Sequence, residues 1–199
     1  VAGNNHTVKN LKINGTVEIP YGGYYCSSYG GYYCEPQPTG YGVYLYESTN
    51  ANVTNVTVSN SYFALYTDAA RNSTIQDNTF SGVVYGAYVN GYYDQYYCDL
   101  GYLYYCGSSG NTLSNNTFSP YSSYYHEVGV YLVYAARNNT IRGNTISNFN
   151  YGLFVYDYYC YYYGDIYCPN GNTIYQNNFI DSIYSQIYAY GYSTTVYNK

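Results

Sequence analysis

Short runs of apolar and β-branched residues recur along the chain in two patterns that alternate with each other. The first pattern is Thr, most often followed by Ile or Val, then four residues and another apolar residue. The second is most often Gly, an apolar residue, an aromatic residue and a second apolar residue. Val53 and Ile75 stand 22 positions apart, as do Val43 and Leu65, and longer intervals are about 22 plus an insertion. Such a period indicates stacked supersecondary units that bury a common core.

Six copies of each pattern can be aligned. The first centres on Val8, Val53, Ile75, Leu113, Ile141 and Ile174, and the second on Val43, Leu65, Ala87, Val130, Leu153 and Ile187. Both are rich in Val, Ile, Thr and Tyr and bounded by Gly, Asn and Ser, which is typical of β-strands. Two short strands with their turns describe one coil of a parallel β-helix. We therefore predict a single all-β domain over residues 1–199 with about six 22-residue coils, and insertions near residues 20–40, 91–110, 119–128 and 157–171.

Two columns of like residues are expected along this stack. Where an apolar side chain of the second pattern points inward, the next residue points outward, and it is aromatic in every copy: Tyr44, Tyr66, Tyr88, Tyr131, Phe154 and Tyr188. Such a stripe stabilises a sheet by cross-strand contacts and offers a flat surface to sugar rings or to another subunit. In the first pattern, Asn occupies one position four times, at Asn78, Asn116, Asn144 and Asn177. We predict a structural ladder of stacked Asn side chains there.

The six cysteines form three pairs with the same spacing, each within a Tyr-rich insertion. Six cysteines can pair in many ways, but equal spacing in three separate insertions favours local closure. A zinc site would need closer spacing and usually His partners. We predict the disulfides Cys26–Cys34, Cys98–Cys106 and Cys160–Cys168, which indicate an oxidising compartment or a hyperthermophile. The Tyr-covered loops that they close are interpreted as contact elements.

The composition of the chain argues against some classes of binding partner. Only 9% of the residues are charged and the net charge is −5, so no basic field exists to attract nucleic acid. The sequence contains no apolar run of about 18 residues, the length that would predict a membrane span. The chain begins at Val1 without an apolar leader, which suggests a secreted, cell-surface form whose signal peptide has been removed. Seven N-x-[ST] triplets agree, and we expect some of them to carry glycan: Asn5, Asn14, Asn52, Asn55, Asn72, Asn115 and Asn138.

The repeat strings resemble those of a known group of proteins. Thr74-Ile75-Gln76-Asp77-Asn78-Thr79-Phe80, Thr140-Ile141-Arg142-Gly143-Asn144-Thr145-Ile146 and Gly129-Val130-Tyr131-Leu132 resemble right-handed parallel β-helix repeat proteins, the NosD-type and pectate-lyase-like groups above all. The resemblance implies a right-handed parallel β-helix. Members include polysaccharide lyases, glycoside hydrolases, surface adhesins and tailspikes, so function has to be argued from sites.

Catalytic chemistry finds little support in the sequence. Lyases and hydrolases on this fold need clustered carboxylates, often with Ca²⁺ or a basic residue, whereas the 11 acidic residues here are scattered. Asp77 has no acidic partner at the matching positions, and we interpret His126-Glu127 as a solvated loop pair. Arg71 and Arg137 are interpreted as repeated turn residues. Two His and no Met leave few ligands for copper, so we predict no catalytic residue, metal site or cofactor.

Two functions remain. The first is the subunit of a self-assembling extracellular filament or sheath, glycosylated and stacked head to tail, because unpaired strands at the end coils are templates for another chain. Low charge with disulfides points to the surface of a thermophile. The alternative is a secreted carbohydrate-binding protein, less readily a carbohydrate-cleaving one, that uses the stripe at Tyr44, Tyr66, Tyr88, Tyr131 and Tyr188 as its platform.

Overall fold

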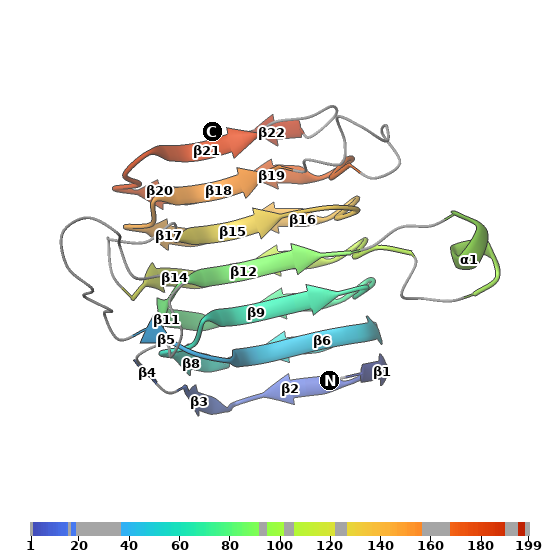
Figure 1. Cartoon of the computed structure of the whole chain (residues 1–199), viewed down its shortest axis with the longest axis horizontal. Coiled ribbons are helices and arrows are strands. Elements are labelled where there is room, and N and C mark those ends of the chain that lie inside the picture. The colour runs from blue at the N-terminus through green and yellow to red at the C-terminus, as the bar shows by residue number, and fades with distance from the viewer. Residues whose placement is uncertain are drawn as a thin grey trace.

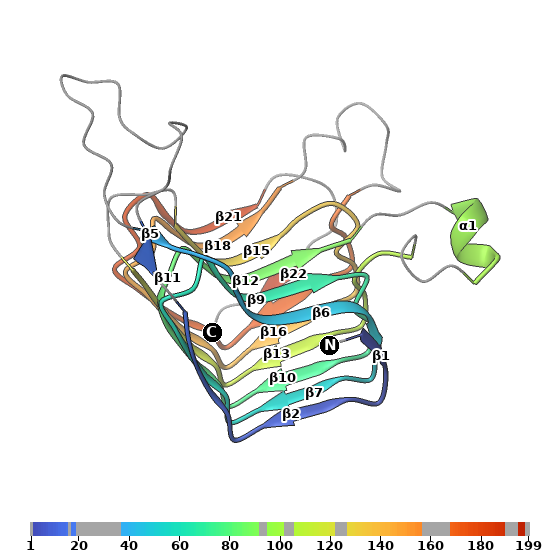
Figure 2. The same cartoon turned by 60° about the horizontal axis from the view of Figure 1, so that its bottom comes forward.

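The chain forms a stack of parallel coils with three faces (Figures 1 and 2). The computed structural model describes residues 2–15, 17–18, 37–91, 95–101, 106–121, 127–156, 168–189 and 195–197. Within these residues three sheets run along the stack, and every strand pair inside them is parallel. The predicted all-β parallel β-helix is therefore confirmed.

The three sheets, here called A, B and C, are listed in spatial order. Sheet A contains β1 (Ala2–Asn4), β6 (Tyr41–Thr49), β9 (Phe63–Asp68), β12 (Tyr85–Asn90), β15 (Val128–Leu132), β18 (Tyr151–Val155) and β21 (Ser185–Ala189). Sheet B contains β2 (Thr7–Lys9), β7 (Asn52–Thr54), β10 (Thr74–Gln76), β13 (Thr112–Ser114), β16 (Thr140–Arg142), β19 (Thr173–Tyr175) and β22 (Thr195–Tyr197). Sheet C contains β3 (Lys12–Asn14), β8 (Thr57–Ser59), β11 (Thr79–Val83), β14 (Thr117–Pro120), β17 (Thr145–Ser147) and β20 (Asn178–Ile180).

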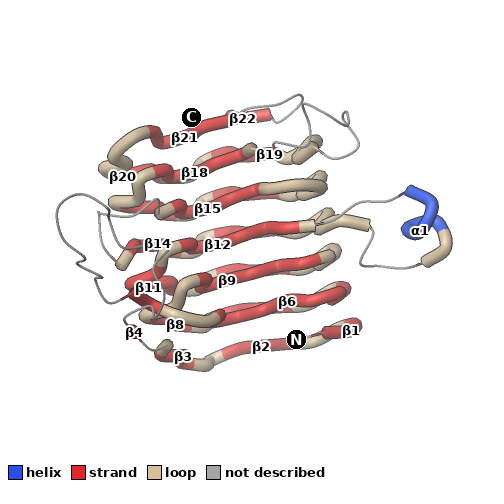
Figure 3. The backbone as a smooth tube through the Cα atoms, viewed as in Figure 1, coloured by secondary structure: helices blue, strands red, loops and turns tan. Residues whose placement is uncertain are grey.

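Three elements lie outside these sheets. The strands β4 (Val17–Glu18) and β5 (Gln37–Pro38) pair with each other in antiparallel fashion. The short helix α1 (Gln95–Asp99) follows β12 and lies to the side of the stack (Figure 3). β5 and α1 fall within the insertions expected near residues 20–40 and 91–110, and β4 lies just before the first of them.

Each coil has three strands rather than the two that the sequence predicts. The chain passes from sheet A to sheet B and then to sheet C before it returns to sheet A in the next coil. The first sequence pattern, read as one segment, bends in the middle and so supplies strands to both B and C. Asn55, Asp77 and Asn115 make this bend with φ between 52° and 56°, a left-handed conformation that Asn and Asp adopt more readily than other non-glycine residues.

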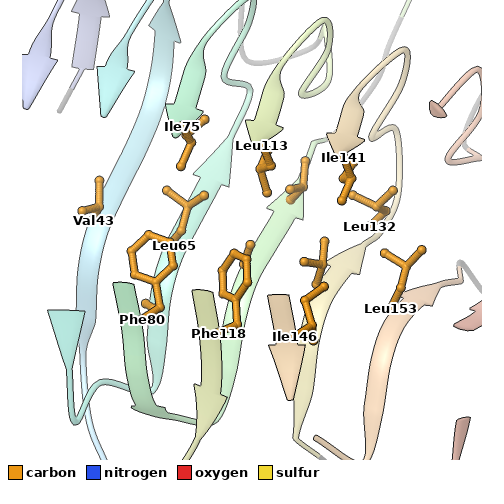
Figure 4. Packing of buried hydrophobic residues seen from close by; sticks show 14 of the residues in the cluster. Val43, Leu65, Ile75, Phe80, Leu113, Phe118, Leu132, Ile141, Ile146 and Leu153 are labelled. Atoms are coloured by element: carbon orange, nitrogen blue, oxygen red, sulfur yellow. The ribbon is translucent and has the colours of Figure 1, made fainter. Parts of the chain in front are cut away.

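The core is a continuous column of apolar side chains from all three sheets (Figure 4). Leu65 of sheet A, Ile75 of sheet B and Phe80 of sheet C are all 0% exposed, and corresponding residues of the next coils repeat this layer. Full burial of one such side chain contributes about 1.5–3 kcal/mol. At the two ends of the stack the inward residues Val8, Ile13 and Ile187 are only partly buried.

Glycine before the inward residues of sheet A allows two coils to approach closely. A Cβ atom on Gly129 would lie 2.3 Å from Cγ2 of Ile146 and 2.6 Å from the carbonyl oxygen of Gly152.

We expect Gly129→Ala to lower the free energy of unfolding by about 1–3 kcal/mol because the core is already full there. Chemical denaturation followed by circular dichroism would measure this, and exposed Thr117→Ala should stay within about 0.5 kcal/mol of the parent. Equal stability of the two variants would show that the coils can separate at no cost.

Candidate functional site

The outer face of sheet A carries an unbroken column of aromatic rings, here called the aromatic column. Its members are Tyr44, Tyr66, Tyr88, Tyr131, Phe154 and Tyr188, which are paired in register from coil to coil. Successive ring centroids lie 5.2, 5.2, 5.0, 5.1 and 4.7 Å apart. The structure therefore brings all six residues of the predicted stripe into mutual contact.

A second row of rings, which the sequence reading missed, lies beside this column. Tyr41, Phe63 and Tyr85 stack with centroid separations of 5.2 and 5.1 Å, and the ring of Tyr151 lies 4.9 Å from that of Phe154. The signal was present in the sequence, since an aromatic residue precedes the glycine of the second pattern at Tyr41, Tyr85 and Tyr151. The two rows together make sheet A an aromatic surface about two rings wide.

Burial keeps the phenols in the middle of the column protonated. It raises the pKa of Tyr66 well above its ordinary value, and the nearby carboxylate of Asp68 raises it further. Burial likewise raises the pKa of Tyr88, helped by the adjacent hydroxyl of Tyr131. Burial, followed by the charge of Glu47, also raises the pKa of the Asp68 carboxyl. These shifts follow from removing the charged forms from water.

Asp68 and Asn90 are paired in register where the strands β9 and β12 end. The Asn90 side-chain amide donates to the Tyr66 hydroxyl at 3.1 Å and to Oδ1 of Asp68 at 3.3 Å. Asp68 is only 9% exposed. These contacts join one carboxylate to one amide and one phenol, and Glu47 is the acid close enough to raise the pKa of Asp68.

The predicted Asn ladder lies inside the stack, at the corner between sheets B and C. The backbone N–H and the side-chain amide of Asn78 both donate to Oδ1 of Asn116, at 3.1 and 2.9 Å. Asn116 donates in the same way to Asn144, and Asn144 to Asn177, at 2.9–3.0 Å. Each side-chain amide also donates to a carbonyl of the preceding coil, so these buried groups are satisfied on both sides.

A second Asn ladder, absent from the sequence prediction, lies at the corner between sheets A and B. Asn111 donates to Oδ1 of Asn139, and Asn139 to Oδ1 of Asn172, at 2.9–3.0 Å. Ser73 begins this ladder, because its backbone N–H donates to Oδ1 of Asn111. The signal for this ladder is the Asn or Ser that stands directly before the Thr of the first pattern.

All seven predicted glycosylation residues are exposed, and none lies within a strand of sheet A. Five of them make left-handed turns at the two corners that border sheet B: Asn5, Asn55, Asn72, Asn115 and Asn138. Asn52 begins β7 of sheet B, and Asn14 ends β3 of sheet C.

The cysteines are described only in part. The predicted Cys98–Cys106 disulfide is present, with its Cα atoms 4.9 Å apart. Cys168 is buried and also disulfide-bonded. Cys26, Cys34 and Cys160 lie outside the described residues, as does His126.

The residues weighed for catalysis are dispersed. Glu127 is 0% exposed, so its interpretation as part of a solvated pair is wrong. Its backbone N–H donates to Oδ1 of Asn150, which draws the residue into the coil just before β15. Arg71 and Arg137 belong to one column of bridged turn residues. Within the part of the chain that the structure describes, no three His, Cys, Asp or Glu side chains come close enough to hold a metal ion.

Comparison with known proteins gives one match. No curated protein and no solved structure is similar enough to this chain to match it. Among the described residues, no helix has the length and apolar character needed to cross a membrane. A family model described as right handed beta helix region matches residues 1–199. Together with the parallel coils of the structure, this match shows that the chain belongs to the right-handed β-helix family.

Proposed function

We propose that this chain is the subunit of an extracellular, self-assembling filament or sheath in which copies stack end to end. The observation that carries the proposal is the placement of exposed apolar residues at the two ends of the stack. In the first two coils these are Leu11, Tyr41 and Tyr46, and at the other end they are Ile180, Ile183, Tyr184 and Tyr188. A stacked copy would cover both groups and complete the burial of Val8, Ile13 and Ile187.

The strands at both ends support the same joint. Among the described residues, β1, β2 and β3 each pair on one side only, with β6, β7 and β8. At the other end β20, β21 and β22 likewise each have one described partner. Unpaired N–H and C=O groups on such strands are templates for further pairing. A parallel stack of this kind continues most simply when the last coil of one copy meets the first coil of the next.

Charge favours a head-to-tail joint over a joint between like ends. Residues 2–15 carry Lys9 and Lys12 and no acidic residue, whereas residues 178–189 carry Asp181 and no basic residue. Two N-terminal ends would bring these lysines together, whereas a joint between opposite ends would not. Because repeated contacts between unlike ends do not close on themselves unless the geometry forms a ring, such a joint extends into a filament.

The sides of the stack suit an extracellular setting. Disulfides persist in oxidising compartments, and two described cysteines form one disulfide within a coil insertion. Glycans at the predicted positions would cover sheet B and its two corners, and would leave sheet A without glycan. Lateral contacts between stacks would then use the aromatic surface of sheet A.

Carbohydrate binding is the second candidate, because Tyr41, Tyr184 and Tyr188 expose large parts of their rings. Sugar stacking requires an aromatic face that is open to solvent. In the middle of the column the rings of Tyr66 and Tyr88 are stacked on each other with an interplanar angle of 3°, so these faces are turned toward neighbours rather than outward. Rings stacked in this way serve packing within the chain rather than stacking on a sugar ring.

End-specific variants test the stacking proposal. The 199-residue chain should form filaments in electron microscopy, whereas Leu11→Asp and Ile183→Asp should each be monomers in light scattering. Each variant places a carboxylate in an apolar contact, and a loss of about 1.4 kcal/mol already weakens association tenfold. An equimolar mixture should form dimers and nothing longer, because each variant keeps one intact end.

The matched control is Leu100→Asp, since Leu100 is 58% exposed but follows α1 at the side of the stack. It should assemble like the parent chain. Dimers in either end variant alone would instead indicate joints between like ends. A parent chain that remains monomeric at every concentration would overturn the proposal, and a glycan-binding screen would then test the second candidate.

A further inference from the structure

The aromatic column runs the length of the stack without a gap between neighbouring rings. Five consecutive centroid separations of 4.7–5.2 Å connect Tyr44 near one end to Tyr188 at the other. Stabilising the sheet does not require that all of these rings be phenols, since phenylalanine would pack as well. Five of the six are tyrosine, so the column carries phenols in addition to its packing.

The rest of the chain leaves tyrosine as the side chain most easily oxidised by one electron. The sequence contains no Trp and no Met. The described cysteines Cys98, Cys106 and Cys168 are in disulfides, so they offer no thiolate. Among the residues that the structure describes, a one-electron oxidant therefore finds tyrosine the easiest side chain to oxidise.

The ends of the column differ from its middle in their access to water. At one end, Tyr41 of the second row lies 5.3 Å from Tyr44 and is 53% exposed, and at the other end Tyr188 is 41% exposed. Tyr66 and Tyr88 are half-buried or more. A phenol that loses an electron must also lose its proton, and burial disfavours that loss in the middle of the column. The exposed rings at the ends are where the proton leaves most easily, so they are where an oxidised tyrosine is most stable.

We propose that the aromatic column is a relay for oxidising equivalents, which carries a tyrosyl radical formed at one coil to the exposed tyrosines at the ends of the stack. The oxidant belongs to the class of diffusing one-electron oxidants, such as peroxyl radicals. In the first step a tyrosine gives one electron to the oxidant, which is reduced, and one proton to water. In each later step the radical takes one electron from the neighbouring ring and one proton from water, while that neighbour releases one proton.

One position of the column interrupts the phenols. Phe154 separates Tyr131 from Tyr188, and its ring is much harder to oxidise than a phenol. Tyr151 lies beyond this interruption, with its ring 4.9 Å from that of Phe154 and 6.1 Å from that of Tyr188. If the column is a relay, Phe154→Tyr should therefore increase radical transfer to the far end. A column that only stabilises the sheet predicts no such increase.

The test attaches a photo-oxidant at one end of the stack and measures tyrosyl radicals at the other end. The chain has two histidines, so His126→Gln leaves His6, in the first coil, as the site for a ruthenium–bipyridyl photo-oxidant. A flash in the presence of a nitroso spin trap marks tyrosyl radicals covalently, and peptide mass spectrometry locates them. We expect marks on Tyr184 and Tyr188 at the far end, in a share that does not change when the protein is diluted.

Variants that keep the rings separate the relay from packing. Tyr88→Phe with Tyr131→Phe should lower far-end marking several-fold and leave marking at Tyr41 and Tyr44 unchanged, whereas Phe154→Tyr should raise it. Tyr175→Phe, on sheet B and outside the column, is the matched control and should have no effect. Unchanged far-end marking in the double variant, or marking that falls with dilution, would overturn the relay. All of these variants are made in the Leu11→Asp background, which cannot stack end to end, so the readout is made on single chains and is independent of filament formation.

Discussion

Replacing Asn144 by alanine is expected to lower the free energy of unfolding by about 3 kcal/mol or more. The change leaves the backbone N–H and the side-chain amide of Asn116 without their acceptor, and the carbonyl of Leu113 without its donor. All of these groups are buried, and a buried polar group without a partner costs about 1–3 kcal/mol. For a chain of this size the thermal midpoint should fall by about 2–4 °C for each kcal/mol.

Asn178 provides the control for this prediction, because it follows a ladder residue directly but points into solvent. Asn178→Ala should stay within about 0.5 kcal/mol of the parent. Thermal and denaturant unfolding of the two variants, followed by circular dichroism, would compare them. If Asn144→Ala were as stable as Asn178→Ala, the ladder would be only a by-product of the stacked turns.

Replacing Phe118 by alanine is expected to cost about 3–5 kcal/mol, the range for removing a fully buried aromatic ring. The ring is 0% exposed, its centroid lies 5.1 Å from that of Phe80, and it fills the space next to Gly86. The cavity would therefore open between two consecutive coils. Denaturant unfolding measures the loss of stability.

Phe118→Leu tests whether volume rather than aromaticity is what matters. It keeps most of the apolar volume, so its cost should be clearly smaller than that of alanine. Equal losses for leucine and alanine would mean that the aromatic contact with Phe80, not the filling of the core, holds these coils together.

The period of the sequence predicts the strands well because each coil buries the same positions. Val43, Leu65 and Ala87 occupy equivalent inward places, and the aromatic residue after each of them faces outward in register. The third strand of each coil was missed for a physical reason. A single left-handed residue such as Asp77 turns the chain between sheets B and C, and it leaves no break in the apolar pattern on either side.

Burial of polar residues is harder to predict than burial of apolar ones. Asn139 and Asn172 stand before a strand, where Asn is also common in exposed turns, and only the coil next to them reveals that their amides are enclosed. Glu127 follows an insertion, and its burial depends on how that insertion returns to the stack. The insertions themselves differ in length and residues from coil to coil, so no repeat predicts their conformation.

The direction of the Asn ladders has a consequence for the whole molecule. In both ladders the donor belongs to the coil nearer the N-terminus and the acceptor to the next coil. Successive peptide groups of a strand point in opposite directions along the stack axis, so their dipoles largely cancel, whereas these amide dipoles all point one way. The interior therefore has a net dipole along its axis, and hydrogen bonds in series polarise one another. Copies joined head to tail would add these dipoles, so a long assembly would align in an electric field.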